Sequence, residues 1–80
     1  MKVRYLGPDI GVDGLVNGKE YEVVSVNEFC GYLAVIDESG EDYLYHPKRP
    51  QAICGEYKGG RFEIVTDDEN NTLRKAILGY

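Results

Sequence analysis

The sequence of 80 residues has no tryptophan, one histidine, one methionine and two cysteines. It also lacks any apolar run near the ~20 residues that a membrane helix requires. Met1–Leu6 has the pattern of a strand, not that of a charged and then apolar leader. We therefore expect a cytoplasmic protein with no membrane partner. In that compartment Cys30 and Cys54 are expected to be reduced core residues; a disulfide between them is the alternative that sequence leaves open.

Basic residues are also scarce: nine Lys and Arg stand against fourteen Asp and Glu, and the net charge is −5. Nucleic-acid binding depends on Lys and Arg that displace counterions, so this balance argues against that function unless the basic residues cluster. A chain of this length forms one domain, 1–80, that is too small for a deep enclosed active site. Any site is expected on a surface groove, a loop rim or an oligomer interface.

Apolar and polar residues alternate in several short stretches bounded by Gly, Pro and Asn, which is typical of β-strands. We expect strands at 2–6, 19–26, 32–37, 42–46 and 61–65, and a further short one at 52–57. Stretch 32–37 is apolar on both faces, which is typical of a central strand. Within 19–26 the pattern switches at Val24 and Val26, which indicates a bulge or bend. Short strands joined by Gly-rich turns predict a small barrel, whose closure removes exposed edges.

The C-terminal segment has helical periodicity instead. Leu73, Ala76, Ile77 and Tyr80 fall on one helical face. Thr66 and Asp67 are candidate N-caps, and Gly79 is a candidate terminator. The spacing predicts a helix over about 68–78, with a later start as the alternative because Asn70 and Asn71 weaken its beginning.

Three segments carry a resemblance: LVNGKEYEV at 15–23, VIDESGEDYLY at 35–45 and KGGRFEIV at 58–65. Together they resemble a group of small SH3-like barrel proteins from bacterial and phage genomes. The similarity extends to about residue 66 and implies a mainly β, SH3-like barrel of about five strands. Phe62 stands where the pattern of the group has tryptophan. The group has no settled function, so the resemblance transfers no functional residue.

Few residues offer metal or nucleophilic chemistry. Cys30, His46 and Cys54 can supply three zinc ligands, but structural zinc sites usually contain a close Cys pair, and none is present. Catalysis by Cys30 and His46 requires an activated thiol and an oxyanion hole, for which the sequence has no signal. We therefore predict no cofactor, no metal and no enzymatic activity, and we expect His46 to cap a strand end.

Carboxylates surround Gly40, at Asp37, Glu38, Glu41 and Asp42. Such a cluster is typical of a solvated hairpin tip, and an acid–base pair or a weak Ca²⁺ site is the functional alternative. The segment 55–61 contains Gly, Lys and Arg, but it lacks the pattern of a phosphate-binding loop and predicts a hairpin turn. An anion contact from Lys58 and Arg61 is the functional alternative.

Tyrosines and basic residues gather in the stretch from 43 to 61. They are Tyr43, Tyr45, Lys48, Arg49, Tyr57, Lys58 and Arg61. We predict a non-catalytic binding module for a protein or peptide, in which the rings supply flat contact area and the basic residues fix orientation. Packing of some of these rings in the core is the alternative.

Two other functions stay open at this point. A nucleic-acid-binding accessory protein would stack bases on the tyrosines and would hold its basic residues on one face. A nucleotide or small-ligand binding protein would need a pocket that a single chain of this size hardly supplies, and so would need a dimer. The sequence leaves the oligomeric state undetermined.

Overall fold

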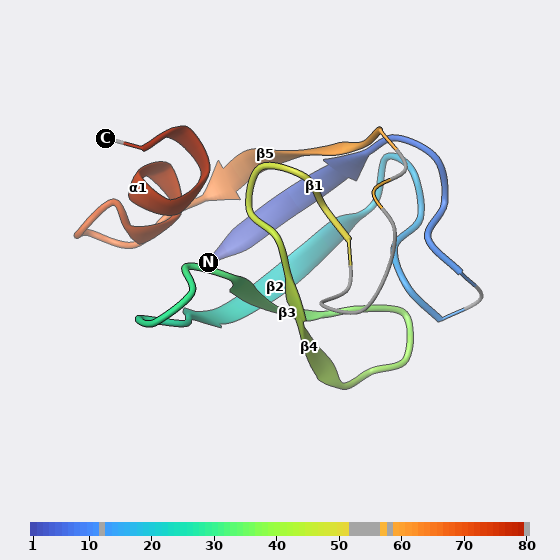
Figure 1. Ribbon diagram of the computed structural model, residues 1–80, viewed down its shortest axis with the longest axis horizontal. Coiled ribbons are helices and arrows are strands. Elements are labelled where there is room, and N and C mark those ends of the chain that lie inside the picture. The colour runs from blue at the N-terminus through green and yellow to red at the C-terminus, as the bar shows by residue number, and fades with distance from the viewer. Residues whose placement is uncertain (12, 52–56, 58, 80) are drawn as a thin grey trace.

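The computed structural model describes residues 1–11, 13–51, 57 and 59–79, which form five strands and one helix (Figure 1). The strands are β1 (Lys2–Leu6), β2 (Glu20–Val26), β3 (Leu33–Ile36), β4 (Asp42–Tyr45) and β5 (Arg61–Thr66), and the helix is α1 (Thr72–Leu78). Five of the expected strands are confirmed; the sixth, at 52–57, lies outside the described residues except for Tyr57. Among the described residues no helix has the length and apolarity to cross a membrane.

The strands form one antiparallel sheet in the order β4-β3-β2-β1-β5. The central strand is therefore β2, and the expectation that 32–37 occupies the centre is wrong. The apolar pattern on both faces of β3 reflects burial instead, because Leu33, Ala34 and Val35 are all buried. In the described part of the chain no pairing joins β4 to β5, so the sheet is open and the predicted barrel closure is not confirmed.

The bulge expected in β2 is present. Residues Glu20 to Glu22 pair with β1, whereas Val23, Ser25 and Val26 pair with β3, and the register shifts around Val24. A bulge bends a strand and increases its twist. The bend at Val24 allows β2 to serve both halves of the sheet.

One core lies on one face of the sheet, where strand residues spaced two apart pack with Leu15, from the segment between β1 and β2, and with Leu73 of α1. Its buried members are Val3, Tyr5, Leu15, Tyr21, Val23, Leu33, Val35, Tyr45, Phe62 and Leu73. The ring of Tyr5 packs edge-on to Phe62, with 6.1 Å between ring centroids. A Cβ atom at Gly60 would lie 2.5 Å from the ring of Tyr5, so only glycine allows this approach.

The helix α1 begins at Thr72, four residues later than expected, although it ends as expected at Gly79, whose φ is 80°. The hydrogen bonds of the first N–H groups of the helix explain why it begins there. The carboxylate of Asp67 accepts hydrogen bonds from the N–H groups of Leu73 (2.9 Å) and Arg74 (3.0 Å), and that of Asp68 accepts one from Thr72 (2.9 Å). These bonds cap the helix across an intervening loop and hold that loop outside it.

The capping carboxylate of Asp67 is the basis of a first prediction. We expect Asp67→Ala to lower the free energy of unfolding by about 1 kcal/mol, because three backbone N–H groups lose an acceptor. Glu69→Ala, at an exposed position of the same loop, is the control and should change little. Urea denaturation at neutral pH measures both variants.

The same effect should depend on pH. Burial raises the pKa of Asp67, but the hydrogen bonds from Leu73, Arg74 and Asp68 outweigh it and lower the pKa below its ordinary value. A lowered folded-state pKa means that the stabilisation is present above about pH 4 and is lost as the pH falls through the folded-state value. If the difference in free energy of unfolding between the native chain and Asp67→Ala stays constant as the pH falls, this explanation is wrong.

Candidate functional site

An open hollow of about 370 Å³ lies between the loop 7–19 and the turn that joins β3 to β4. We call it the Tyr43 hollow. Its lining residues are Ile10, Gly11, Asp13, Gly14, Asp37, Ser39, Tyr43 and Tyr45. Two of the residues predicted as a binding surface, Tyr43 and Tyr45, therefore meet here, beside a loop that the sequence did not connect with them.

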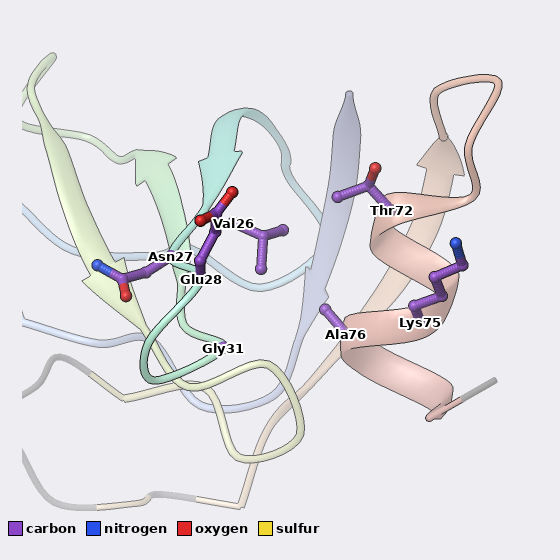
Figure 2. A pocket seen from close by; sticks show the side chains of 7 residues that line it. All are labelled: Val26, Asn27, Glu28, Gly31, Thr72, Lys75 and Ala76. Carbon is purple, nitrogen blue, oxygen red and sulfur yellow. The ribbon is translucent and has the colours of Figure 1, made fainter.

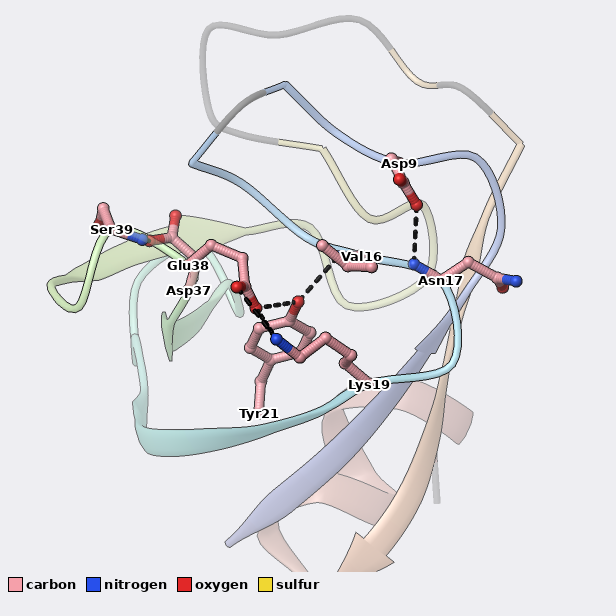
Figure 3. Close-up of polar contacts among 8 residues, drawn as sticks. All are labelled: Asp9, Val16, Asn17, Lys19, Tyr21, Asp37, Glu38 and Ser39. Atoms are coloured by element: carbon pink, nitrogen blue, oxygen red, sulfur yellow. Dashed lines mark hydrogen bonds and ion pairs between the residues drawn. The ribbon is translucent and has the colours of Figure 1, made fainter.

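The loop 7–19 has its own internal structure. Ile10 and Leu15 exchange backbone hydrogen bonds of 2.8 and 3.2 Å, and Leu15 is fully buried. The N–H of Asn17 donates to the carboxylate of Asp9 at 2.9 Å (Figure 3), and the amide oxygen of Asn17 accepts from Gly7 at 3.0 Å. These bonds keep the loop in one shape, so its tip can form a wall of the hollow.

The tip of this loop is joined to the β3–β4 turn. The N–H of Glu38 donates to the carbonyl of Gly14 at 2.9 Å, and the N–H of Ser39 donates to the carbonyl of Asp13 at 3.1 Å. The two segments are far apart in sequence, yet these bonds make them opposite walls of one hollow.

Side chains strengthen that junction (Figure 3). The hydroxyl of Tyr21 donates to Glu38 at 2.7 Å and accepts from the N–H of Val16 at 2.7 Å. The ammonium of Lys19 binds the same carboxylate at 3.0 Å. Burial, followed by the hydrogen bond to Glu38, raises the pKa of Tyr21 to about 12. The Tyr21 hydroxyl therefore stays protonated and keeps donating well above neutral pH.

The floor of the hollow contains a buried carboxylate. Asp37 is only 7% exposed; its Oδ2 accepts from the hydroxyl of Tyr45 at 2.7 Å, and its Oδ1 accepts from the N–H of Ser39 at 3.0 Å and from the Ser39 hydroxyl. Burial, followed by the bond to Asp37, raises the pKa of Tyr45 above its ordinary value. Asp37 is thus a buried hydrogen-bond acceptor that holds the turn together. The expectation that it lies in a solvated hairpin tip is wrong. Tyr45 is only 2% exposed and packs in the core, so it lines the hollow without presenting an accessible ring.

Tyr43 is the accessible ring of the pair, with 49% of its surface exposed. Its hydroxyl donates to Glu41 at 3.1 Å. The hydrogen bond and charge of Glu41, then burial, then the charges of Asp37 and Asp42 raise the pKa of Tyr43. Three carboxylates therefore place the exposed ring in a negative electrostatic field.

The predicted basic residues lie elsewhere. Lys48 and Arg49 follow β4 in a turn that His46 caps: its Nδ1 accepts from their N–H groups at 3.1 and 3.0 Å, which confirms the expected capping role. A Cβ atom at Gly79 would lie 3.8 Å from Nζ of Lys48, so this ammonium sits beside the C-terminal end of α1. Neither basic residue lines the Tyr43 hollow.

The last three predicted residues precede or begin β5, the edge strand opposite β4. Tyr57 is 46% exposed and its hydroxyl donates to the carbonyl of Gly60 at 3.0 Å. Arg61 lies 3.6 Å from Glu63, which offsets part of its charge. Lys58 lies outside the described residues. Among the predicted residues that the structure describes, Tyr43 and Tyr45 line the Tyr43 hollow and the others do not.

A second groove, of about 410 Å³, lies between α1 and the turn that follows β2 (Figure 2). We call it the α1 groove; it is lined by Val26, Asn27, Glu28, Gly31, Thr72, Lys75 and Ala76. Phe29 projects from this turn and is 99% exposed, whereas the neighbouring Cys30 has a free, exposed thiol. The expectation that Cys30 is a core residue is wrong; Cys54 lies outside the described residues. The sequence signal that was overlooked is a phenylalanine inside a predicted turn.

No group of three His, Cys, Asp or Glu side chains in the described ranges is arranged to hold a metal ion. One of the three zinc ligands considered above, Cys54, falls outside those ranges.

Comparison with protein-family models, with curated proteins and with solved structures gives no match to this chain.

The bond between Tyr45 and Asp37 can be tested directly. We expect Tyr45→Phe to lower the free energy of unfolding by about 1–3 kcal/mol, because a buried carboxylate loses a donor. Tyr43→Phe removes the corresponding hydroxyl two residues earlier on the same strand, from an exposed bond, and should change stability little. Urea denaturation measures the free energy of unfolding of both variants. An equal loss in the two would show that the bond from Tyr45 to Asp37 stabilises the fold no more than an exposed hydrogen bond does.

The raised tyrosine pKa values predict a loss of stability in alkali. In the unfolded chain the tyrosines titrate near pH 10, whereas Tyr21 titrates at about 12 in the folded protein and the pKa of Tyr45 is also raised. Above about pH 10 the unfolded chain binds fewer protons than the folded one, so stability is intact below that pH and falls as the pH rises towards 12. Urea denaturation and tyrosinate absorbance across this range measure the effect. Titration of every tyrosine near pH 10 in a chain that stays folded would contradict it.

Proposed function

We propose that this protein is a non-catalytic binding module that takes an extended, basic segment of a protein partner at the Tyr43 hollow. One observation carries the proposal: a half-exposed tyrosine ring stands at an open hollow whose nearest charges are carboxylates. A Lys or Arg side chain is attracted both to the face of such a ring and to the surrounding negative field.

The shape of the hollow suits a peptide better than a reaction. It is open, and its floor carboxylate, Asp37, already accepts three hydrogen bonds. Ile10 is only partly buried, so it offers apolar surface beside the exposed ring of Tyr43. A ligand with alternating apolar and basic side chains can use both parts of the surface.

The negative charge around the Tyr43 hollow favours a protein ligand over a nucleic acid. The phosphate backbone of a nucleic acid would meet Asp13 at the rim and Glu41 beside Tyr43, and like charges disfavour that approach. The basic residues that would neutralise phosphates do not line the hollow. Nucleic-acid binding is therefore an outcome to be tested here and not the favoured function.

We also infer that the sheet is an SH3-like barrel that is only partly closed. The strand order and the bend of β2 at Val24 support this, because a bent strand shared by two halves curls a sheet towards closure. The predicted similarity of 15–23, 35–45 and 58–65 to SH3-like proteins agrees with the same architecture.

The binding proposal predicts a charge preference that depends on one ring. We expect the protein to bind an extended Lys- and Arg-containing peptide more tightly than an acidic peptide of equal length. Tyr43→Ala should weaken this binding about three- to tenfold, and Tyr43→Phe should largely preserve it, because the ring and not the hydroxyl makes the contact. Asp13→Lys should also weaken it. Isothermal titration calorimetry at two salt concentrations measures each effect, and higher salt should lower the affinity.

Phe29→Ala is the matched control, since it removes an exposed aromatic ring from outside the Tyr43 hollow. Unchanged binding by this variant locates the effect at the hollow. Equal affinity of native protein and Tyr43→Ala, a preference for the acidic peptide, or tighter binding of an oligonucleotide would each overturn the proposal.

A further inference from the structure

Among the residues that the structure describes, the most exposed large apolar side chain is far from the Tyr43 hollow. Phe29 lies at the tip of the turn after β2, 99% exposed, and this turn and α1 lie at the end of the molecule opposite the loop 7–19 (Figure 1). The turn is well formed: the amide oxygen of Asn27 accepts from the N–H of Phe29 at 2.9 Å and from that of Cys30 at 3.2 Å, and the N–H of Gly31 donates to the carbonyl of Asn27 at 2.8 Å. A shaped turn thus holds an aromatic ring out in water, which costs free energy unless the ring is covered.

The α1 groove lies beside the turn that carries Phe29, and it can receive an aromatic ring. Val26 and Ala76 face each other across the α1 groove (Figure 2), and both are partly buried and pack against the core. The volume of about 410 Å³ can hold an aromatic side chain. The geometry of the turn directs the ring of Phe29 outward, so it is not among the lining residues of the groove in its own chain.

The two rims of the groove carry opposite charges. Glu28 is on the turn and Lys75 is on the helix (Figure 2). The ion pairs formed by the described residues include neither of them. Such a surface is complementary to itself under two-fold rotation. The ring of one copy meets the groove of the second copy, and the negative rim of one meets the positive rim of the other.

We propose that the occupant of the α1 groove is Phe29 of a second copy of this chain, in a two-fold symmetric dimer. Each ring enters the groove of the other copy, between Val26 and Ala76. Glu28 of each copy then faces Lys75 of the other. The net charge of −5 opposes association at long range, but salt at physiological strength screens that repulsion while the contact pairs persist. This inference does not depend on the peptide site.

Sedimentation equilibrium of the full chain, from micromolar to millimolar concentration and under reducing conditions, tests the proposal. Reduction prevents a disulfide at the exposed thiol of Cys30 from joining two copies. We expect the mass to rise from that of a monomer towards that of a dimer. Phe29→Ala should weaken association about tenfold or more, because buried aromatic side chains dominate interface energies and the dimer contains two of them. Tyr43→Ala, at the other surface, should leave association unchanged.

A charge exchange gives the sharper test. Glu28→Lys alone places like charges opposite each other at both rims, and so does Lys75→Glu alone, so each variant should be more monomeric than the native chain. A mixture of the two variants restores two attractive pairs, one at each rim, and should form a heterodimer. Recovery in the mixture also shows that each variant is folded.

Three results would overturn the dimer: a monomer at every concentration, association that Phe29→Ala leaves intact, or a mixture of the charge variants that associates no better than either alone. A monomer whose Phe29 is required for binding a different protein would also overturn it, because the groove would then have another occupant.

Discussion

The hydrogen bond from the Tyr21 hydroxyl to Glu38 is the contact on which the site end of the molecule depends. The ring of Tyr21 belongs to the core of the sheet, whereas its hydroxyl meets both the loop 7–19, through Val16, and the β3–β4 turn, through Glu38. A long loop loses much conformational entropy when it is ordered. Together with the backbone bonds from Glu38 and Ser39, this buried side chain joins two irregular segments and offsets part of that cost. The Tyr43 hollow exists because the two segments are joined.

The acidic turn shows how neighbouring carboxylates can take different roles. Asp37 points inward and accepts hydrogen bonds from Tyr45 and Ser39, whereas the exposed Glu41 accepts one from the hydroxyl of Tyr43. A buried charge is tolerated only where donors replace water. The inward carboxylate therefore stabilises the hairpin, and the outward ones set the electrostatic potential that a ligand meets.

Much of the fold could be predicted from the sequence, and much less of the site. Period-two alternation located five strands to within one or two residues, and a break in that pattern located the bulge at Val24. The start of α1 was predicted only approximately, because the caps reach it from Asp67 and Asp68 across a loop, a contact that helix periodicity does not encode. For the site, proximity along the chain grouped Tyr43 with Tyr57 and Arg61, but neither of these two residues lines the Tyr43 hollow.

The sequence by itself determined the β class and the turns, because local alternation and glycine placement act over a few residues. Only the tertiary structure decided which tyrosines are buried, which charges surround the exposed one and that Phe29 projects beside a groove. Those properties depend on strand order and on contacts such as those of Glu38 with Gly14 and Tyr21. Contacts between segments distant along the chain are set by packing of the whole sheet, and no local pattern records them.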